Sequence, residues 1–447
     1  MFFTLAWAQS PDQQLARDIF KQLIDINTTD SVGDNTRAAE AMAARFRAGG
    51  FPDSDIHVFG PEPRKGNVVV RIHGTGAGRP ILFIGHLDVV EAKRTDWSFD
   101  PFQFREMDGY FYGRGTQDMK GDDAVLVTTF LRLKREGFQP PRDLILALTS
   151  DEEGGNANGV NWLLQNHRDL VDAEFCINSD AGGGDIKNGR HVFMGLQAAE
   201  KVFLSFKLEV TNSGGHSSLP TKDNAIYHLA EGLSRLAQFD FPVHLFDVTR
   251  AYFERRAQFV DGQTASDMKN IVGKPNDAGV VGRLSASPLY NALLRTTCVA
   301  TMLSGGHAEN ALPQTATAVV NCRVLPVDKP AEVEATLKRV LADPKINITV
   351  MTAAKTSEFA PLNPKVVAAV SSATTKHWPG LQVIPLMETG ATDGVYTRVA
   401  GLPTYGVSGM FNDEDDIRAH GRDERILVKS FYDAVDFMYD FVRDLLK

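Results

Sequence analysis

The chain has few cysteines, no long apolar run and no excess of positive charge. Its 447 residues include three cysteines, Cys176, Cys298 and Cys322. Because this number is small and odd, we expect no disulfide framework, and we expect the cysteines to be small buried apolar residues. No apolar run approaches the ~20 residues that a membrane helix needs. The net charge of -9 argues against nucleic acid or an anionic membrane surface as a partner.

The N-terminus leaves two cellular locations open. Ala6, Trp7 and Ala8 precede Gln9 in the small-x-small pattern of a signal-peptide cleavage site. Residues 1–5, however, carry no positive charge and are too short for a complete apolar segment. We expect a periplasmic or secreted protein with a remnant of a signal peptide, and a cytoplasmic protein is the alternative.

The remaining composition predicts a two-domain globular protein. The chain is 43% hydrophobic and 23% charged, which is ordinary, and 447 residues exceed what one hydrophobic core usually holds. Early in the chain, apolar runs typical of strands alternate with helical patterns. The predicted strands are 68–72, 81–84, 144–148 and 175–178, and the predicted helices are 11–26, 35–49, 120–136 and 157–168. This alternation predicts an α/β fold in which helices cover both faces of a sheet.

The pattern changes near residue 197. Strands at 202–210, 297–304, 316–325 and 346–350 and helices at 224–236 and 331–341 follow in the β-α-β-β-α-β order of a ferredoxin-like domain. We therefore expect a first catalytic segment at 1–196, an inserted domain at 197–355 and a second catalytic segment at 356–447. Within the inserted domain, residues 240–290 form an additional insert. Its aromatic residues are expected to pack internally, with an apolar substrate pocket as the alternative: Phe241, Phe246, Tyr252 and Phe253.

Five residues that lie far apart in the sequence have side chains that together could bind metal at one centre. They are two histidines and three acids: His86, Asp118, Glu153, Asp180 and His420. Three of them follow predicted strands, and functional groups collect at such strand ends in open α/β sheets. A catalytic zinc ion needs three protein ligands, so five ligands with one shared carboxylate can hold two zinc ions. The set predicts a hydrolase with a dinuclear zinc site, in which Co2+ or Mn2+ can substitute.

Neighbouring residues supply the remaining chemistry. Asp118 lies in a glycine-rich loop and is the natural bridging ligand, because a shared carboxylate offsets the repulsion between two cations. Asp88 lies two residues after His86 on the same face of an extended segment, so it is expected to accept the other ring N–H of that histidine. Glu152 and Glu153 are adjacent, and one can bind metal while the other acts as general base for a metal-activated water.

In combination, these motifs resemble a known family. Gly-Arg-Gly-Thr-Gln-Asp-Met-Lys-Gly at 113–121 and Asp-Glu-Glu-x-Gly at 151–155 are similar to motifs of dizinc peptidases. That family includes glutamate carboxypeptidase, carboxypeptidase S, aminoacylase and succinyl-diaminopimelate desuccinylase. The resemblance extends from about residue 12 to 445. It implies a zinc-exopeptidase-like mixed sheet between helices, with the inserted ferredoxin-like domain as a lid and dimerisation domain.

The family pattern also implies how the ligands divide between the metals. Two zinc ions share Asp118, and the other ligands form two pairs: His86 with Asp180, and Glu153 with His420. Glu152 is implied as the general base that later gives its proton to the leaving amine. Asp88 is implied as the residue that orients the first histidine.

Further motifs resemble substrate-binding positions of the family. In relatives, the histidine of the Gly-Gly-His motif reaches the active site of the partner subunit, which implies an oxyanion role for His216 and a homodimer. Arg323 resembles the carboxylate-binding arginine, and a guanidinium can grip a carboxylate with two parallel hydrogen bonds. A surface salt bridge is the alternative for Arg323. Asn310, Gly390 and Thr392 resemble other substrate-binding residues.

These inferences predict zinc-dependent hydrolysis of a peptide or amide bond in small substrates with a free α-carboxylate, as in a dipeptidase or carboxypeptidase. An N-acyl-amino-acid amidohydrolase is the first alternative, because it would use the same metals and base. An aminopeptidase and a non-catalytic metal-binding protein are further alternatives. The expected partners are the small substrate and a second copy of the chain, without nucleic acid or membrane.

Overall fold

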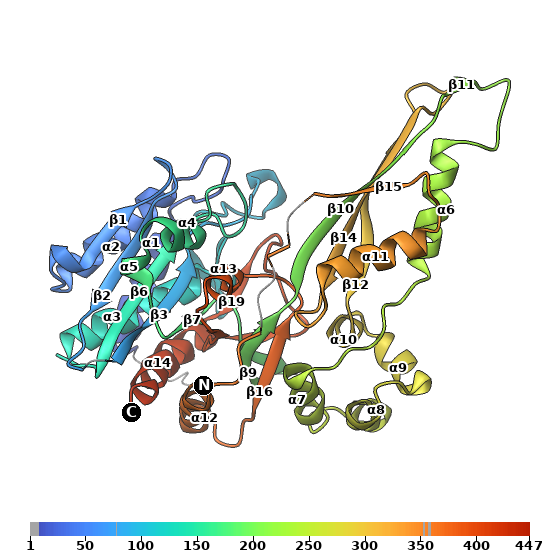
Figure 1. Cartoon of the computed structure of the whole chain (residues 1–447). Coiled ribbons are helices and arrows are strands. Elements are labelled where there is room, and N and C mark those ends of the chain that lie inside the picture. The colour runs from blue at the N-terminus through green and yellow to red at the C-terminus, as the bar shows by residue number, and fades with distance from the viewer. Residues whose placement is uncertain (1–8, 77, 352–353, 356–358) are drawn as a thin grey trace, which may run out of the picture. The chain divides into compact units, whose positions relative to one another are not determined.

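The computed structural model describes residues 9–76, 78–351, 354–355 and 359–447 (Figure 1). The tripeptide at 6–8, on which the export prediction depends, lies outside the described residues. The chain forms two units. The first unit comprises Met1–Ala198, Ala360–Leu386 and Thr392–Lys447, and the second unit comprises Ala199–Phe359 and Met387–Ala391. The short return of 387–391 to the second unit was not anticipated from the sequence.

The first unit contains a ten-stranded mixed sheet. Its strands are β1 (Ile56–Phe59), β2 (Asn67–Ile72), β3 (Gly78–His86), β6 (Arg142–Thr149), β7 (Phe175–Asn178), β8 (Gly183–Lys187), β9 (Arg190–Glu200), β16 (Val383–Glu388), β17 (Thr404–Gly406) and β18 (Phe411–Asp413). They lie in the order β1-β2-β6-β3-β7-β17-β9-β8-β18, and β16 pairs with β9. The central strands β6, β3, β7 and β17 run parallel to one another.

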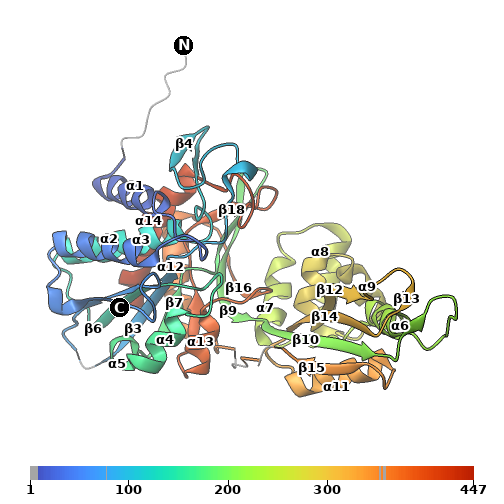
Figure 2. The ribbon, with the colours of Figure 1, turned by 90° about the horizontal axis from the view of Figure 1, so that it is seen from above.

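Helices cover both faces of this sheet (Figure 2). One face carries α1 (Pro11–Ile24), α2 (Asn35–Ala48), α3 (Lys120–Arg135), α12 (Pro364–His377) and α14 (Val428–Leu445), and the other carries α4 (Gly159–Asn166), α5 (Arg168–Val171) and α13 (Gly394–Val399). In β2, Val68 and Val70 face the first layer and Val69 faces the second, because successive side chains of a strand point to opposite faces. All three are buried. The predicted mixed α/β sheet between helices is confirmed.

The parallel strands deliver their following loops to one edge of the sheet. β3, β6 and β7 end at His86, Thr149 and Asn178. In the strand register, His86 pairs with Thr149 and Ile84 pairs with Asn178. The loops that follow these three strands therefore begin close to one another, as expected at the carboxyl ends of strands in an open α/β sheet.

The second unit contains a four-stranded antiparallel sheet. Its elements follow as β10 (Val202–Thr211), α6 (Ala225–Ala237), β12 (Thr297–Gly305), β14 (Thr315–Val324), α11 (Pro330–Leu341) and β15 (Asn347–Val350). The strand order is β12-β14-β10-β15. Both helices pack on one face, where they share a core with alternate residues of the strands. This is the ferredoxin-like arrangement that the element order predicts.

Four short helices make up the insert between α6 and β12. They are α7 (Asp247–Arg256), α8 (Gly262–Gly273), α9 (Ala278–Ser285) and α10 (Pro288–Leu294). Its aromatic residues are buried: Phe241, Phe246, Tyr252 and Phe253. These side chains therefore pack within the unit, as expected. None of the described helices, here or elsewhere, is long and apolar enough to cross a membrane.

The cysteines correct one prediction. Cys298 and Cys322 form a disulfide, and Cys176 is free and buried. The expectation of unpaired, buried cysteines holds for Cys176 but was wrong for the other two. An odd count does not exclude one pair, and strand register is not visible in the sequence. β12 and β14 are neighbours, and their register places the two cysteines directly opposite each other.

Candidate metal centre

Five side chains from five segments meet at the carboxyl edge of the large sheet. His86 is the last residue of β3, and the loops after β6 and β7 supply Glu153 and Asp180. Asp118 lies in the loop before α3, and His420 lies in the loop between β18 and β19 (Arg425–Leu427). All five belong to the first unit. Their ligand atoms form two neighbouring groups.

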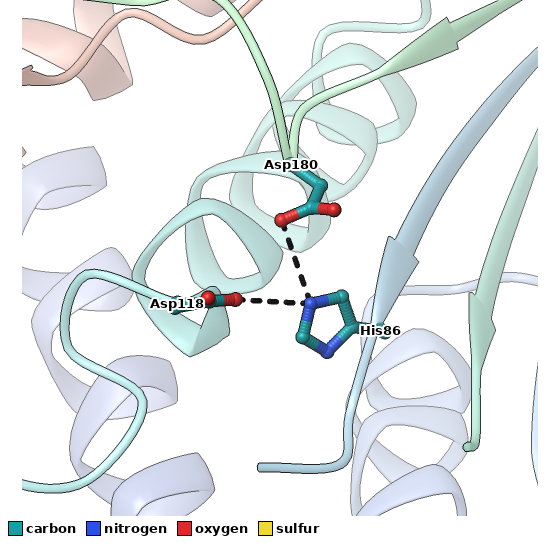
Figure 3. A group of neighbouring side chains, drawn as sticks. All are labelled: His86, Asp118 and Asp180. Atoms are coloured by element: carbon teal, nitrogen blue, oxygen red, sulfur yellow. Dashed lines mark ion pairs between the residues drawn. The ribbon is translucent and has the colours of Figure 1, made fainter. Parts of the chain in front are cut away.

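The first group consists of His86, Asp118 and Asp180 (Figure 3). Nε2 of His86 lies 3.1 Å from Oδ1 of Asp118 and 3.5 Å from Oδ1 of Asp180. Apart from these ion-pair contacts, neither Nε2 of His86 nor Oδ1 of Asp118 has a hydrogen-bond partner among the described residues, although both atoms are buried. Buried polar atoms rarely lack a partner, and two that converge on one point fit the ligands of a cation.

The second group consists of Asp118, Glu153 and His420. Nε2 of His420 lies 3.0 Å from Oδ2 of Asp118 and 2.9 Å from Oε1 of Glu153. In each group, all ligand atoms lie within 4.8 Å of one another. Asp118 thus directs one carboxylate oxygen to each group, which is the geometry of a carboxylate that bridges two cations.

Around the two ligand groups, the carboxylates outnumber the positively charged side chains, and the pKa values of both histidine ligands are shifted as a result. Burial lowers the pKa of His86, but Asp180 and Asp118 outweigh it and raise that pKa well above its usual range. Hydrogen bonds to Asp118 and Glu153 raise the pKa of His420 to about 10. Burial raises the pKa of Asp180 to about 7. Metal cations would relieve this imbalance, and imidazole nitrogens with carboxylate oxygens, three to a group, are a donor set that zinc accepts.

Asp88 fixes the loop that carries Glu152 and Glu153. Its carboxylate accepts the backbone N–H groups of Glu152 at 3.1 Å and Glu153 at 2.9 Å. The expected contact with His86 uses a different atom: Nδ1 of His86 lies 3.0 Å from the carbonyl oxygen of Asp88 but 3.7 Å from its carboxylate. Two backbone donors occupy the carboxylate, so the carbonyl orients the ring instead.

Glu152 stands outside both ligand groups. No described residue donates a hydrogen bond to its carboxyl group, in contrast to the adjacent Glu153, which contacts His420. Burial, followed by the negative charge of Asp180, raises the pKa of Glu152 well above its usual range. Positive charge held by the five neighbours would lower this pKa again. A carboxyl group in this position can exchange protons with a reacting molecule.

The predicted substrate residues fall in both units. Thr392 is buried in the first unit, where its hydroxyl oxygen accepts hydrogen bonds from Nδ2 of Asn178 at 3.1 Å and from N–H of Gly394 at 3.0 Å. Its hydroxyl therefore helps to hold the loop in place. Gly390 is exposed and groups with the second unit.

The second unit brings His216 and Asn310 together but separates them from Arg323. His216 ends β11 (Gly215–His216), which pairs with β13 (Ala311–Leu312), and N–H of Ser217 donates to the carbonyl oxygen of Asn310 at 3.0 Å. This pair lies near the start of β14, whereas Arg323 is close to the end of that strand. The eight residue-to-residue steps of extended chain from Thr315 to Arg323 span roughly 27 Å.

Two polar networks beside the ligands were not predicted from the sequence. Lys65 forms ion pairs with Asp30 and Asp151, and Asp151 has a left-handed backbone (φ 60°) at the start of the Glu152 loop. Glu424 is fully buried next to the loop that contains Asp118. Its sequence context, Arg-Asp-Glu-Arg at 422–425, is typical of a solvated surface turn. The only signal was its position four residues after His420.

This fold and this pair of linked ligand groups define a metallopeptidase-type hydrolase. The chain belongs to peptidase family M20/M25/M40, whose sequence profile matches residues 82–444. The family resemblance drawn from the motifs is therefore confirmed.

Relatives and solved structures agree with this membership. The chain is 30% identical over 390 residues to probable carboxypeptidase S-like 2 of Dictyostelium discoideum, covering 83% of this chain and 72% of that protein. It is 27% identical over 378 residues to the human N-fatty-acyl-amino acid synthase/hydrolase PM20D1, covering 82% and 74%. The M20 family metallo-carboxypeptidase Sso-CP2 from Sulfolobus solfataricus has the same fold, with a TM-score of 0.72 at 17% identity over 96% of this chain and 99% of that one.

Proposed function

We propose that this protein uses two zinc ions to hydrolyse the amide bond of small substrates with a free α-carboxylate, such as dipeptides or the C-terminal residue of a peptide. The observation that carries the proposal is the sharing of Asp118 between two three-residue ligand groups, with Glu152 left free beside them. Carboxypeptidase names among the similar proteins support the same reaction class.

Different residues of the chain have different roles in the proposed reaction. Bound zinc ions would polarise the scissile carbonyl and lower the pKa of a water molecule. Glu152 takes a proton from the attacking water and gives it to the leaving amine. Asp88 keeps Glu152 in place through the backbone N–H groups that it accepts. The base and the ligands thereby keep a fixed spacing.

Arg323 supports the requirement for a carboxylate. Its guanidinium carbon lies 4.8 Å from the centre of the Phe203 ring, and no carboxylate of the described residues pairs with it. Burial lowers the pKa of Arg323. A partly desolvated guanidinium without a carboxylate partner among the described residues favours an anionic ligand.

Hydrolysis of N-acyl amino acids is the second candidate function. The similarity to PM20D1 favours it, because that protein is named for N-fatty-acyl-amino acids. Such substrates also carry a free α-carboxylate, so Arg323 fits either candidate. The two differ only in the group on the other side of the scissile bond.

A substrate panel tests the proposal. We expect the zinc-loaded protein to cleave dipeptides with a free carboxylate and to cleave their C-terminal amides at least about tenfold less efficiently, because a charge-assisted bidentate contact contributes roughly 1.5–3 kcal/mol. Arg323→Gln should raise KM about 10- to 100-fold for the acids and leave the amides unchanged. The measurement is kcat/KM by release of free amine, with N-acetyl and long-chain N-acyl amino acids in the same panel.

The matched control is Arg339→Gln, because Arg339 also stacks on an aromatic ring of the second unit, Phe239 at 5.5 Å. Its kinetics should remain those of the wild type. Faster cleavage of N-acyl amino acids than of dipeptides would select the second candidate. Equal cleavage of acids and amides by wild type and by Arg323→Gln would refute the carboxylate requirement.

We also propose that the active form is a homodimer in which His216 serves the site of the partner subunit. One small substrate cannot contact both Arg323 and the His216–Asn310 pair of a single chain, since they lie at opposite ends of β14. The edge strand β12 offers a surface for pairing, because Val299, Met302 and Leu303 are 60–71% exposed. An unpaired, apolar sheet edge is a ready template for another strand.

A complementation experiment shows whether an active site uses the His216 of its own chain or that of the partner subunit. His216→Ala and Glu152→Gln should each be nearly inactive alone. Refolded together in equal amounts, they should regain about a quarter of wild-type activity, because half of the random dimers are mixed and each mixed dimer has one complete site. Sedimentation velocity on the mixture confirms that dimers are present. No recovery in a mixture that contains dimers would show that His216 acts within its own chain.

A further inference from the structure

Glu424 collects four hydrogen-bond donors around one buried carboxylate. Oε1 accepts from N–H of Gln117 at 2.7 Å and N–H of Asp118 at 3.2 Å. Oε2 accepts from Nη1 of Arg114 at 2.6 Å and N–H of Gly115 at 3.2 Å. A carboxylate offers about four acceptor positions, so this group is fully used. Every donor belongs to the loop that carries Asp118.

Strand pairing brings Glu424 to this loop. It directly precedes β19, which pairs antiparallel with β5 (Tyr110–Tyr112), so that Arg425 lies opposite Tyr112. The loop with Asp118 begins at the next residue, Gly113, whose N–H donates to the carbonyl oxygen of Glu424 at 3.1 Å. The pairing of β19 with β5 therefore fixes Glu424 next to the loop.

Arg114 extends this network to the second histidine ligand. Besides its contact with Glu424, it donates from Nη2 to the carbonyl oxygen of His420 at 3.4 Å. Its guanidinium also lies 5.1 Å from the centre of the Trp97 ring. Both Arg114 and Glu424 are buried, with 3% and 0% of their side chains exposed. One ion pair thus contacts the backbone of both Asp118 and His420.

The backbone of His420 needs such support. Its φ is 62°, a left-handed conformation that residues other than glycine rarely adopt without external contacts. The loop also lacks regular secondary structure on either side of the histidine. A second contact comes from Gln117, whose Oε1 accepts N–H of Arg418 at 2.9 Å. Two contacts, one through Arg114 and one through Gln117, therefore connect the loop of Asp118 with the loop of His420.

We propose that Glu424 and Arg114 are positioning residues that set the distance between Asp118 and His420, and thereby the affinity for the metal ion held by Asp118, Glu153 and His420. The proposal rests on the proposed function only in that these side chains bind metal. Residues that orient ligands from behind typically change metal affinity about 10- to 100-fold when they are replaced.

Zinc titration of the metal-free protein tests this role. We expect Glu424→Gln to weaken the affected site about 10- to 100-fold, because an amide has one acceptor oxygen and turns its NH2 group toward two of the four donors. Arg114→Lys should weaken the same site, because an ammonium group cannot reach both Glu424 and His420 with fixed geometry. The readouts are zinc affinity by competition with a chromogenic chelator, and the melting temperature without metal.

Asp143→Asn is the matched control. Asp143 also accepts from an arginine and a backbone N–H, Arg71 at 2.9 Å and Gly74 at 2.8 Å, but it lies at the beginning of β6, away from the carboxyl edge. It should lower the melting temperature without changing zinc affinity. Wild-type affinity in the folded Glu424→Gln and Arg114→Lys proteins would overturn the inference. If Glu424→Gln does not fold, Arg114→Lys decides alone. A wild-type protein that binds no zinc would instead refute the proposed function.

Discussion

Glu152→Gln is expected to bind two zinc ions per chain and to lose about 100- to 10,000-fold in kcat, the range that a positioned general base contributes. The amide keeps the size of the carboxyl group but cannot take a proton. Glu152 belongs to neither ligand group, so its replacement leaves all five candidate ligand residues in place. Metal analysis and steady-state kinetics on the same preparation measure both quantities.

The adjacent residue provides the control. Glu153→Gln changes the same functional group one position later, and both backbone N–H groups are held by Asp88. Glu153, however, faces His420 at 2.9 Å and belongs to the second ligand group. It should therefore lose zinc as well as activity. Equal zinc content in the two variants, or wild-type hydrolysis by either of them, would show that the division of roles between Glu152 and Glu153 is wrong.

This division shows how far the sequence could predict the site. His86 and Asp180 were predicted as ligands because each closely follows a continuous apolar run, and such runs become buried parallel strands. The loop residues Asp118 and His420 have no such periodicity, and only the resemblance to a family identified their pairing. The geometry adds the atoms involved: Oδ1 of Asp118 faces His86, and Oδ2 faces His420.

The failures have a common physical cause. The Cys298–Cys322 pair, the carbonyl contact of Asp88 and the buried Glu424 all depend on which backbone lies next to which. Strand register and loop packing determine these neighbours, and both arise from tertiary contacts between distant segments. A charged residue such as Glu424 is expected at the surface unless its donors are known. The sequence therefore predicts ligands more readily than the residues that position them.

Asp118→Asn is expected to reduce the bound zinc from two ions to at most one per chain and to abolish hydrolysis. Two doubly charged ions about 4 Å apart repel each other by roughly 16 kcal/mol at an effective dielectric constant of about 20. The negative charge of Asp118, shared between both groups, offsets much of this repulsion. Asparagine keeps the shape but removes the charge and one ligand oxygen.

Equilibrium dialysis at low free zinc, followed by elemental analysis, measures the stoichiometry. Asp267→Asn is the control, because Asp267 is a buried carboxylate that accepts two hydrogen bonds of 2.7 Å from Arg283 in the second unit. It should keep two zinc ions. Two ions bound to Asp118→Asn with wild-type affinity would mean that the groups hold their metals independently. Asp118 would then be an ordinary ligand of one ion, and the close contact of its second oxygen with His420 would belong to an ion pair instead of a bridge.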